Sequence, residues 1–538
     1  MPLASLGRAS AIIGAGTLFS RLTGLVRSLV LVAVIGSYGS RAADAFSVAA
    51  MLPTNVYELL AAGVITGILV PQIVKAAAHS DGGSRYVSKL LTLGAVVLVA
   101  ATALMMALAP VLIWLYAATW GPEQKALALS FAYWVLPQLL FYGLFALLGE
   151  VLNARKVFGP YSWAPTVNNL VSIAGFGVFL LVFGGPFTEL GDWDAGMIAL
   201  LGGTATLGIA MQTVVLLFFW KRTRLHVRPD FGWRGIGLRH VGTLAWWTFL
   251  AVVVGQLAGI VQSLVVTQAS GTASVTVMVY AWLIFMLPHS IVAMSISTTY
   301  FTRLAEEITA GRLDRVAPNL DESIRAIALF GFGFTAAIAA ASVPLSRVFT
   351  TSTDGAVAMA WVLCGYLIAL VPFGVLLIIR RAFFAFQDTR TPFVFSLVQA
   401  ALAALGAVLA VAAVGLGMLP LGFLAAAVAL TQSLSTYVQL PVALRLLRRH
   451  TDTAALRGTW RALARFTGAA VPAFVAGWLV FLLIGGVGGW AASDRLLGAV
   501  GGALVGGVAL LVYVAALALL RAPELAIAGR MLQRILGR

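Results

Sequence analysis

The feature that most constrains this chain is a succession of apolar runs, each long enough to cross a lipid bilayer. The hydrocarbon core is about 30 Å thick, so a spanning helix needs roughly 20 apolar residues. Fourteen such runs are predicted, at 9–36, 42–78, 86–118, 124–155, 160–184, 195–220, 239–270, 274–303, 322–349, 355–387, 391–416, 420–447, 460–487 and 495–521. Only 10% of the 538 residues are charged, against about 25% in ordinary globular chains. The sequence therefore predicts an all-α, polytopic membrane protein.

The connections between these runs are short, so no soluble catalytic or binding domain is expected. The first run is expected to remain in the mature protein, because Arg21 interrupts it and no small-residue cleavage site follows. The single cysteine, Cys364, lies in a predicted span, which excludes a disulfide framework and a cysteine metal site. No glycine-rich phosphate loop is present. We therefore expect no cofactor and no metal.

The placement of the basic residues explains the formal charge of +16. Nearly all of the 35 lysines and arginines fall in alternate connections and at the two ends of the chain, on the side that the positive-inside rule assigns to the cytoplasm. The exceptions are Arg41, Lys125, Arg347 and Arg495 on the other side, and Arg21 and Arg27 inside the first run. This pattern predicts two cytoplasmic termini. Membrane topology therefore accounts for the positive charge, and nucleic-acid binding is not expected.

Two segments of the chain resemble each other weakly. The second and eighth runs each contain Leu-Pro, at Pro53 and Pro288, and each ends in a basic turn. Such repeats favour two homologous lobes, a common organisation among transporters that bind substrate near the middle of the membrane.

Arg21 and Arg27 stand inside the first run, in "LFSRLTGLVRSLVLVAVIG". Arg21 is expected roughly 18 Å from either end of a helix over 9–36, at 1.5 Å per residue, which is too deep for its side chain to reach the surface. Two arginines at this depth cost roughly 5–7 kcal/mol on insertion scales. They are therefore expected to face a water-filled cavity or a charged partner.

Three interpretations of these arginines are open. A structural ion pair would need a buried carboxylate, and only Asp44, Glu58 and Glu150 are expected well inside spans. A late start of the helix would leave both arginines at the inner surface, but would bring Arg41 and Asp44 into the next apolar window. The third interpretation, which we favour, is that the arginines line a cavity that binds an oxyanion.

Other polar residues are candidates for the same cavity. Ser20 lies beside Arg21, and Asp44 opens the second span, where a carboxylate is also favoured by the helix dipole alone. Gln256 in the seventh span can face either a cavity or a neighbouring helix. The candidate substrate-binding residues are therefore Arg21, Arg27, Asp44, Ser20 and Gln256. No catalytic residue is expected.

Several stretches together resemble a known family. They are "SRLTGLVRSLVLVAVIGSYGSRAADAFSVAAMLP", "GVITGILVP", "LPQLLFYGLFALLGEVLNARKVFGPYSWAPTVNN", "TATLGIAMQ" and "RRAFFAFQDTRTPF". They closely resemble the MurJ (MviN) family of lipid II flippases, within the MATE-like multidrug/oligosaccharidyl-lipid/polysaccharide exporter superfamily. The resemblance extends from the first span to about the eleventh.

The resemblance implies two pseudo-symmetric six-helix lobes around a cationic cavity, at 1–222 and 223–450, and two further helices in 451–538 that form a groove for a lipid tail. It places the family's cavity arginines at Arg21 and Arg27 and its aspartate at Asp44, with the arginines holding the pyrophosphate of a polyprenyl-linked sugar. The chain departs from the family pattern at cavity positions in the second and eighth helices. In the second helix, Tyr57 and Glu58 stand where the family pattern has arginines, and Ala62 stands where it has a glutamate. In the eighth helix, the family's cavity arginine and its acidic neighbours correspond to Leu283, Trp282 and Met286. The cavity is therefore expected to be less basic than the family pattern.

The implied function is movement of lipid II, the polyprenyl-pyrophosphate-linked peptidoglycan precursor, from the cytoplasmic to the outer leaflet by alternating access, without enzymatic activity. The alternatives are a flippase or exporter for another polyprenyl-linked glycan, or a membrane enzyme acting on polyprenyl phosphates. Such an enzyme would need paired carboxylates near a membrane face, and the sequence shows none apart from the loop "AEEITAGRLDRVAPNLDES", which is expected to be solvated. The expected partners are lipid II, membrane lipids and cell-wall synthesis proteins, with no nucleic acid. The expected location is the bacterial plasma membrane.

Overall fold

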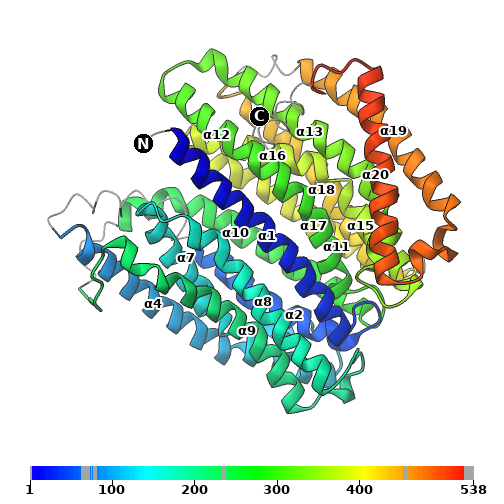
Figure 1. Cartoon of the computed structure of the whole chain (residues 1–538), viewed down its shortest axis with the longest axis horizontal. Helices are drawn as coiled ribbons and strands as arrows, with labels where there is room; N and C mark the ends of the chain where they lie inside the picture. The colour runs from blue at the N-terminus through cyan, green and yellow to red at the C-terminus, as the bar shows by residue number, and fades with distance from the viewer. Residues whose placement is uncertain are drawn as a thin grey trace. The chain divides into compact units, whose positions relative to one another are not determined.

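The computed structural model describes residues 3–61, 73, 76, 81–232, 238–451 and 457–525, with side chains for all of these except 3–13, 238–245 and 457. Every regular element within these ranges is helical (Figure 1). The chain forms two compact units. Unit 1 comprises Met1–Gly36 and Ser40–Gln256, and unit 2 comprises Ser37–Gly39 and Leu257–Arg538.

Unit 1 is built from helices that pack along their lengths. They are α1 (Leu3–Ile35), α2 (Arg41–Leu60), α4 (Ser84–Ala107), α5 (Ala109–Tyr116), α6 (Pro122–Val135), α7 (Gln138–Ala154), α8 (Gly159–Val182), α9 (Ala195–Phe218) and the first part of α10 (Leu238–Val266). Pro137 separates α6 from α7, as expected for a residue that lacks an N–H group and whose ring clashes with the preceding turn. Helix α8 packs between α1 and α9.

Unit 2 contains the remaining helices. They are α11 (Val275–Pro288), α12 (Met294–Thr309), α13 (Val316–Ala340), α14 (Ser342–Arg347), α15 (Thr353–Leu367), α16 (Leu370–Ala385), α17 (Arg390–Gly415), α18 (Leu424–Leu447), α19 (Arg457–Leu483) and α20 (Arg495–Leu519). A π-helical turn, His289–Ala293, joins α11 to α12. Helices α19 and α20 lie side by side (Figure 1).

Thirteen helical stretches within the described residues are long and apolar enough to cross a membrane. They correspond to thirteen of the fourteen predicted runs, and the all-α, multi-pass fold is confirmed. The remaining run, 42–78, begins with α2, which carries Asp44 and Glu58. Most of the rest of that run lies outside the described residues. The predicted three-part division at 222 and 450 stays a prediction.

The first helix begins earlier than predicted. Helix α1 runs without interruption from Leu3 to Ile35, and its membrane-compatible part is Gly14–Ile35. The helix itself thus begins well before Arg21, whereas the alternative that both arginines lie at the inner surface of the membrane stays open.

A group of charged residues ties the end of the described chain to the rest of unit 2. The Glu524 carboxylate is 2% exposed and follows α20. Its Oε1 lies 3.0 Å from Nη2 of Arg465 on α19 and 3.6 Å from Nη1 of Arg325 on α13. Arg325 also pairs with Asp321 at 2.5 Å, and Asp321 accepts a hydrogen bond from Thr459. We refer to these five residues as the Glu524 cluster.

Candidate functional site

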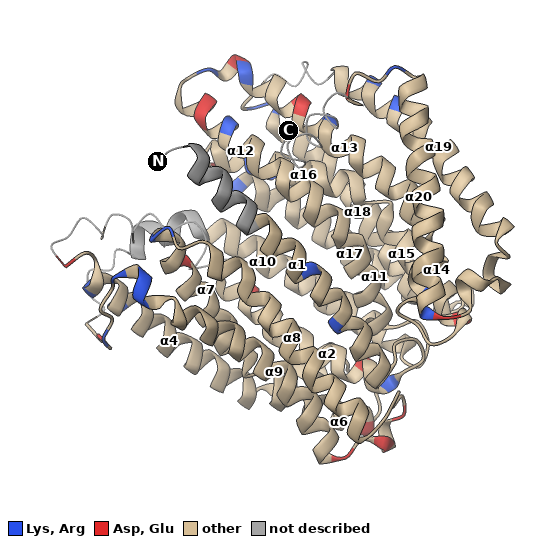
Figure 2. Cartoon of the chain, viewed as in Figure 1, with Lys and Arg blue, Asp and Glu red and all other residues tan. Residues whose placement is uncertain are grey.

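The two arginines of α1 lie within the membrane-compatible part of the helix. Figure 2 shows basic positions partway along α1, away from its ends. Arg21 is exposed and Arg27 is half-buried. Arg21 is seven residues from Gly14 and fourteen from Ile35, or roughly 10 Å and 21 Å of helix, so it lies inside the candidate span Gly14–Ile35. The depth of both arginines in the membrane stays a prediction.

Contacts with α8 fix the orientation of α1. The Nδ2 atom of Asn169 donates to the carbonyl oxygen of Ser20 at 2.8 Å and to Oγ1 of Thr23 at 3.0 Å. Gly24 lies against the same amide, since a Cβ at this position would be 3.4 Å from it. Helix α1 therefore presents Ser20, Thr23 and Gly24 to α8.

No carboxylate neutralises these arginines within the described residues. The ion pairs formed there include neither Arg21 nor Arg27. The interpretation of a structural ion pair with Glu58 or Glu150 is therefore unsupported within the described residues. An arginine without a carboxylate partner in an apolar span needs water or an anion, which favours the third interpretation.

Arg27 belongs to a set of polar and aromatic contacts that continues across unit 1. It interacts electrostatically with Tyr142 of α7, whose side chain is hydrogen bonded to Thr54 of α2. The ring of Tyr57 lies 5.8 Å from that of Tyr142, centroid to centroid. These contacts connect α1 with α7 and α2.

Gln256 of α10 contacts the end of α2 that carries Tyr57, because its Nε2 donates to Oε2 of Glu58 at 3.0 Å. Gln256 is therefore a neighbour of a carboxylate rather than of Arg21. Glu58 is exposed, so the pair offers a carboxylate oriented by an amide. The sequence identified Gln256 but not its partner, which is 198 residues away in the chain.

Asp44 lies at the other end of α2. It is buried in the first turn, which Ser40 caps by accepting a hydrogen bond from the amide of Ala43 at 3.0 Å. The fourteen residues between Asp44 and Glu58 correspond to roughly 21 Å of helix. The structure therefore does not bring Asp44 and the Glu58–Gln256 pair together, although both lie on α2.

The departures from the family pattern have structural counterparts. Tyr57 and Glu58 take part in the contacts described above, whereas Ala62 lies outside the described residues. In unit 2, the ring of Trp282 packs against Phe285 at 4.8 Å and Tyr366 at 5.1 Å. Aromatic packing thus occupies the part of α11 where the family pattern places an arginine.

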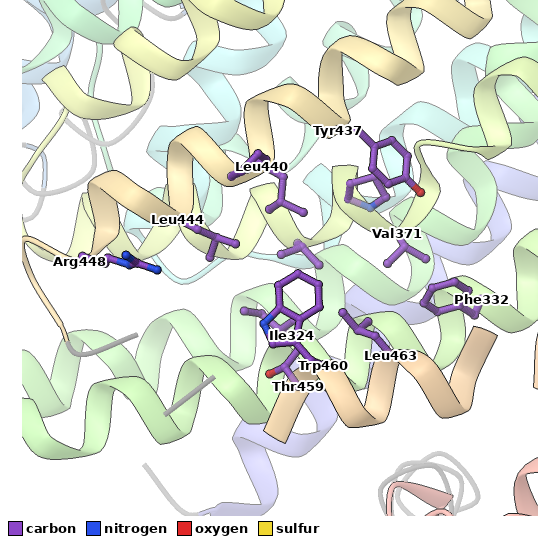
Figure 3. A pocket seen from close by; sticks show the side chains of 13 residues that line it. Ile324, Phe332, Val371, Tyr437, Leu440, Leu444, Arg448, Thr459, Trp460 and Leu463 are labelled. Carbon is purple, nitrogen blue, oxygen red and sulfur yellow. The ribbon is translucent and has the colours of Figure 1, made fainter. Parts of the chain in front are cut away.

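Unit 2 contains a large apolar cavity of about 370 Å³ (Figure 3). Residues from α13, α16, α18 and α19 line it, and the lining residues with polar side-chain atoms are Tyr437, Arg448, Thr459 and Trp460. The apolar lining residues are Ile324, Phe332, Val371, Pro372, Val375, Leu440, Pro441, Leu444 and Leu463, and Tyr437 completes the wall. Such a lining suits a hydrocarbon chain.

The groups needed for metal binding are not gathered anywhere in the described residues. No set of three His, Cys, Asp or Glu side chains there could hold a metal ion. The candidate site consists instead of arginines, amides, hydroxyls and aromatic rings, which bind oxyanions and polar headgroups through hydrogen bonds and charge.

Comparisons with known proteins agree with this architecture. The family model described as "Lipid II flippase MurJ" matches residues 33–501. A probable lipid II flippase MurJ of Haemophilus influenzae is 26% identical over 401 residues, covering 70% of this chain and 75% of that protein. The lipid II flippase MurJ of Burkholderia cenocepacia is 25% identical over 402 residues, covering 72% and 75%.

Solved structures share the fold. A lipid II flippase MurJ in an inward closed conformation has a TM-score of 0.71 at 18% identity and covers 98% of this chain and 100% of its own. An inward-facing multidrug resistance MATE family transporter has a TM-score of 0.64 at 15% identity and covers 80% and 95%. Because the family model matches most of the chain, this multi-pass membrane protein belongs to the lipid II flippase MurJ family.

Proposed function

We propose that this protein moves lipid II from the cytoplasmic to the outer leaflet of the bacterial plasma membrane by alternating access. The observation that carries this proposal is the pair Arg21 and Arg27, which lies within a spanning helix of a MurJ family chain and has no carboxylate partner among the described residues. Arginine binds phosphate oxygens in a planar fork of N–H groups. The pyrophosphate of the polyprenyl carrier supplies the missing negative charge.

The other candidate residues have supporting roles in this proposal. Ser20 holds α1 against α8 through its carbonyl group, so that Arg21 keeps its direction. Gln256 orients the Glu58 carboxylate, which accepts hydrogen bonds from the polar headgroup. Asp44, at the far end of α2, would contact a headgroup only at another stage of transport.

The lipid tail needs an apolar surface while the headgroup crosses. The cavity of about 370 Å³ in unit 2, which borders α19, supports a tail-binding role for the last part of the chain. Three of its lining residues, Thr459, Trp460 and Leu463, belong to the predicted tail-binding region 451–538, and the other ten belong to the predicted lobe 223–450.

The direction of transport follows from the charge of the headgroup. With both termini in the cytoplasm, as the distribution of basic residues predicts, an anionic headgroup moves outward along an inside-negative potential. This contributes about 2.3 kcal/mol per charge per 100 mV. Export that continues unchanged after the potential alone is collapsed would contradict this energetic account.

A second candidate cargo is another polyprenyl-linked glycan. The specific observation that favours it is the less basic environment, since Tyr57 and Glu58 occupy positions where the family pattern has arginines. The pyrophosphate chemistry of Arg21 and Arg27 is the same for both cargoes. Neither cargo requires a catalytic residue.

The test uses cells depleted of their own flippase. The measured quantity is the fraction of lipid-linked peptidoglycan precursor that an externally added, membrane-impermeant hydrolase can cleave. We expect depletion to protect the precursor and this protein to restore cleavage. Unchanged cleavage on depletion and re-expression, with the protein present in the membrane, would contradict lipid II as the cargo and favour another glycan.

A further inference from the structure

The connection between α9 and α10 runs along the side of α4. Residues 224–232 of this connection form no helix or strand, yet three of their backbone amides each donate a hydrogen bond to a hydroxyl oxygen of α4. We call residues 224–232 the strap and the three hydroxyl groups the α4 hydroxyl ladder. All of these residues belong to unit 1. The donor–acceptor pairs are His226 N with Ser84 Oγ at 3.3 Å, Arg228 N with Ser88 Oγ at 3.1 Å, and Asp230 N with Thr92 Oγ1 at 3.0 Å.

The spacing of these hydrogen bonds matches the repeats of both segments. The donating amides are two residues apart in the strap, and a nearly extended chain advances about 6.6 Å in two residues. The hydroxyl groups are four residues apart on α4, where four residues rise about 6.0 Å and return to nearly the same face of the helix. Strap and helix therefore stay in register over all three pairs. Pro229, which has no N–H group, falls between two donating residues, at a position that needs no donor towards α4.

The strap is held more firmly at its beginning than at its end. Leu225 is 7% exposed, and Val227 is half-buried against the same core cluster, which includes Val87 of α4. Towards the end of the strap, the Asp230 carboxylate lies 3.9 Å from Nε of Arg85, which is exposed. A long ion pair with an exposed partner contributes little. Apolar packing thus fixes the first residues, whereas hydrogen bonds to the ladder hold the rest.

The strap can leave the ladder at little cost. An amide that leaves a hydroxyl oxygen exchanges that hydrogen bond for one to water, so the net loss for each bond is small. The hydroxyl groups can remain bonded as well, because Oγ1 of Thr92 already donates to the carbonyl oxygen of Ser88 at 2.8 Å. Serine and threonine in helices commonly form this bond. The side chains of His226 and Arg228 are already exposed, so release requires no new burial of charge.

The strap leads into a helix that belongs to both units. Helix α10 runs without interruption from Leu238 to Val266, and the boundary between the units falls between Gln256 and Leu257. When two units move, a helix that they share either bends at the boundary or shifts as a rod. A shift as a rod needs a longer connection to α9. Only five residues lie between Gly232 and α10, so the nine residues of the strap are the nearest reserve of length.

We propose that the strap is a releasable part of the connection between the two units. It docks on the α4 hydroxyl ladder in one stage of transport and leaves the ladder in another, so that α10 shifts as a rod. This inference rests on the alternating access of the proposed function. A strap that only anchors α10 permanently would behave in the opposite way. For a releasable strap, preventing release stops transport and weakening the docking does not.

The first test locks the strap onto α4 in the full chain. Ser88→Cys/Arg228→Cys introduces two cysteines at positions where the hydroxyl oxygen lies 3.1 Å from the backbone nitrogen. Transport is measured with the hydrolase-accessibility assay in depleted cells, before and after oxidation. We expect the cross-linked protein to transport at about one tenth of the reduced rate or less, because a conformational step is blocked. Reduction with dithiothreitol should restore transport. If this variant fails to fold, Ser84→Cys/His226→Cys, at the first pair of the ladder, decides.

The control cross-link joins two helices that lie wholly within unit 1. In Phe141→Cys/Thr213→Cys the natural Thr213 hydroxyl donates to the Phe141 carbonyl oxygen at 3.0 Å, so a side chain again approaches the backbone of its partner. Helices α7 and α9, which carry these residues, pack against each other. The oxidised control should transport as its reduced form does. The natural Cys364 is present in every sample.

The second test weakens the docking instead. Ser88→Ala/Thr92→Val removes two of the three acceptors of the ladder. Hydrogen exchange of the purified full chain, followed by mass spectrometry, should show the strap amides exchanging about tenfold faster. Lipid II transport by this variant should be at least that of wild type. Ser130→Ala removes a hydroxyl of α6 that donates to the carbonyl oxygen of Ala126, and it should change neither quantity.

Each contrary outcome has its own meaning. If the cross-linked strap transports at the reduced rate, or the folded ladder variant transports poorly, the strap is a permanent anchor and the inference is wrong. If no cross-link forms in the folded protein, or the strap amides exchange equally in wild type and the ladder variant, the docking is absent and the inference is again wrong. If wild type moves no lipid II while exchange still responds to the ladder, the docking is real, but the proposed function fails and the transport role of the strap fails with it.

Discussion

Two pairs of arginines in this molecule differ in how their charge is balanced. Arg325 and Arg465 of unit 2 converge on one carboxylate, that of Glu524, which is almost completely buried. Arg21 and Arg27 of unit 1 lie on α1 and form no ion pair with a carboxylate of the described residues. The first pair joins α13 and α19 to the end of the described chain, whereas we propose that the second pair binds a ligand. The side chains of the two pairs are the same, and only their partners differ.

The largest effect is expected from the double change Arg21→Gln/Arg27→Gln. Two charge-assisted hydrogen bonds contribute together about 3 kcal/mol or more, so transport should fall roughly 100-fold with little change in thermal stability. The hydrolase-accessibility assay in depleted cells measures this. Arg85→Gln is the control. The Arg85 side chain is 79% exposed, and its ion pair with Asp230 is long, at 3.9 Å, so its loss should change little. Full transport by the double variant would contradict a substrate-binding role for Arg21 and Arg27.

The opposite result is expected for Glu524→Gln. Removing the carboxylate leaves Arg325 and Arg465 partly buried without their shared partner, which should lower the free energy of unfolding by about 3 kcal/mol. Thermal unfolding of the purified protein measures the loss, and the transport rate per folded molecule should be retained. Glu123→Gln, at an exposed acidic position, should change neither. A Glu524→Gln protein that is stable but inactive would mean that the cluster serves transport.

A smaller effect is expected at the contact that orients α1. Asn169→Leu keeps the approximate shape but removes two hydrogen bonds, to Ser20 and Thr23, at about 1–2 kcal/mol in total. Stability should fall by this amount, and transport should fall less than in the double arginine variant. The neighbouring Asn168→Leu removes a single hydrogen bond of 3.4 Å to Ser172 and should cost less. If the two variants were equal in both measurements, α1 would not depend on Asn169 for its orientation.

The smallest effect is expected at a partly exposed pair between the spans. Burial alone would raise the pKa of Asp388, but hydrogen bonds from Thr391 and His450 outweigh it, and the pKa lies below its ordinary value of 3.8. A depressed pKa stabilises the fold above the ordinary value, and this contribution is lost as the pH falls below about 4. Asp388→Asn should therefore flatten the dependence of stability on pH in this acidic range. Thermal unfolding from pH 6 to pH 3 measures the difference, and identical profiles would contradict it.

The parts of this structure that could be predicted from sequence are those with a strong one-dimensional signal. An uninterrupted apolar run of about 20 residues has few alternatives to a spanning helix, so the helices were predicted well. Arginine in such a run is unusual because of its cost, so the sequence alone singles out Arg21 and Arg27. The start of α1 was placed too late because its first turns are only moderately apolar.

Other features depend on contacts that the sequence does not encode locally. The amide of Asn169 could have served packing or binding, and only its hydrogen bonds to α1 show which. The pairing of Gln256 with Glu58 joins residues far apart in the chain. The exposed hydroxyl groups of Ser295, Thr298, Thr299 and Thr302 on α12 have no clear signal in the sequence, because serine and threonine are tolerated in spanning helices, where they usually bond to their own backbone. The Glu524 cluster depends on how the chain turns back after α20, which no pattern in that segment predicts.

The central claim is that Arg21 and Arg27 bind the pyrophosphate group. The most direct measurement is the affinity of the purified protein for polyprenyl pyrophosphate relative to polyprenol, which has the same tail and no charge. The account predicts a preference for the pyrophosphate of roughly 100-fold in wild type and in Glu524→Gln, and little preference in Arg21→Gln/Arg27→Gln. An undiminished preference in the double arginine variant would contradict the claim.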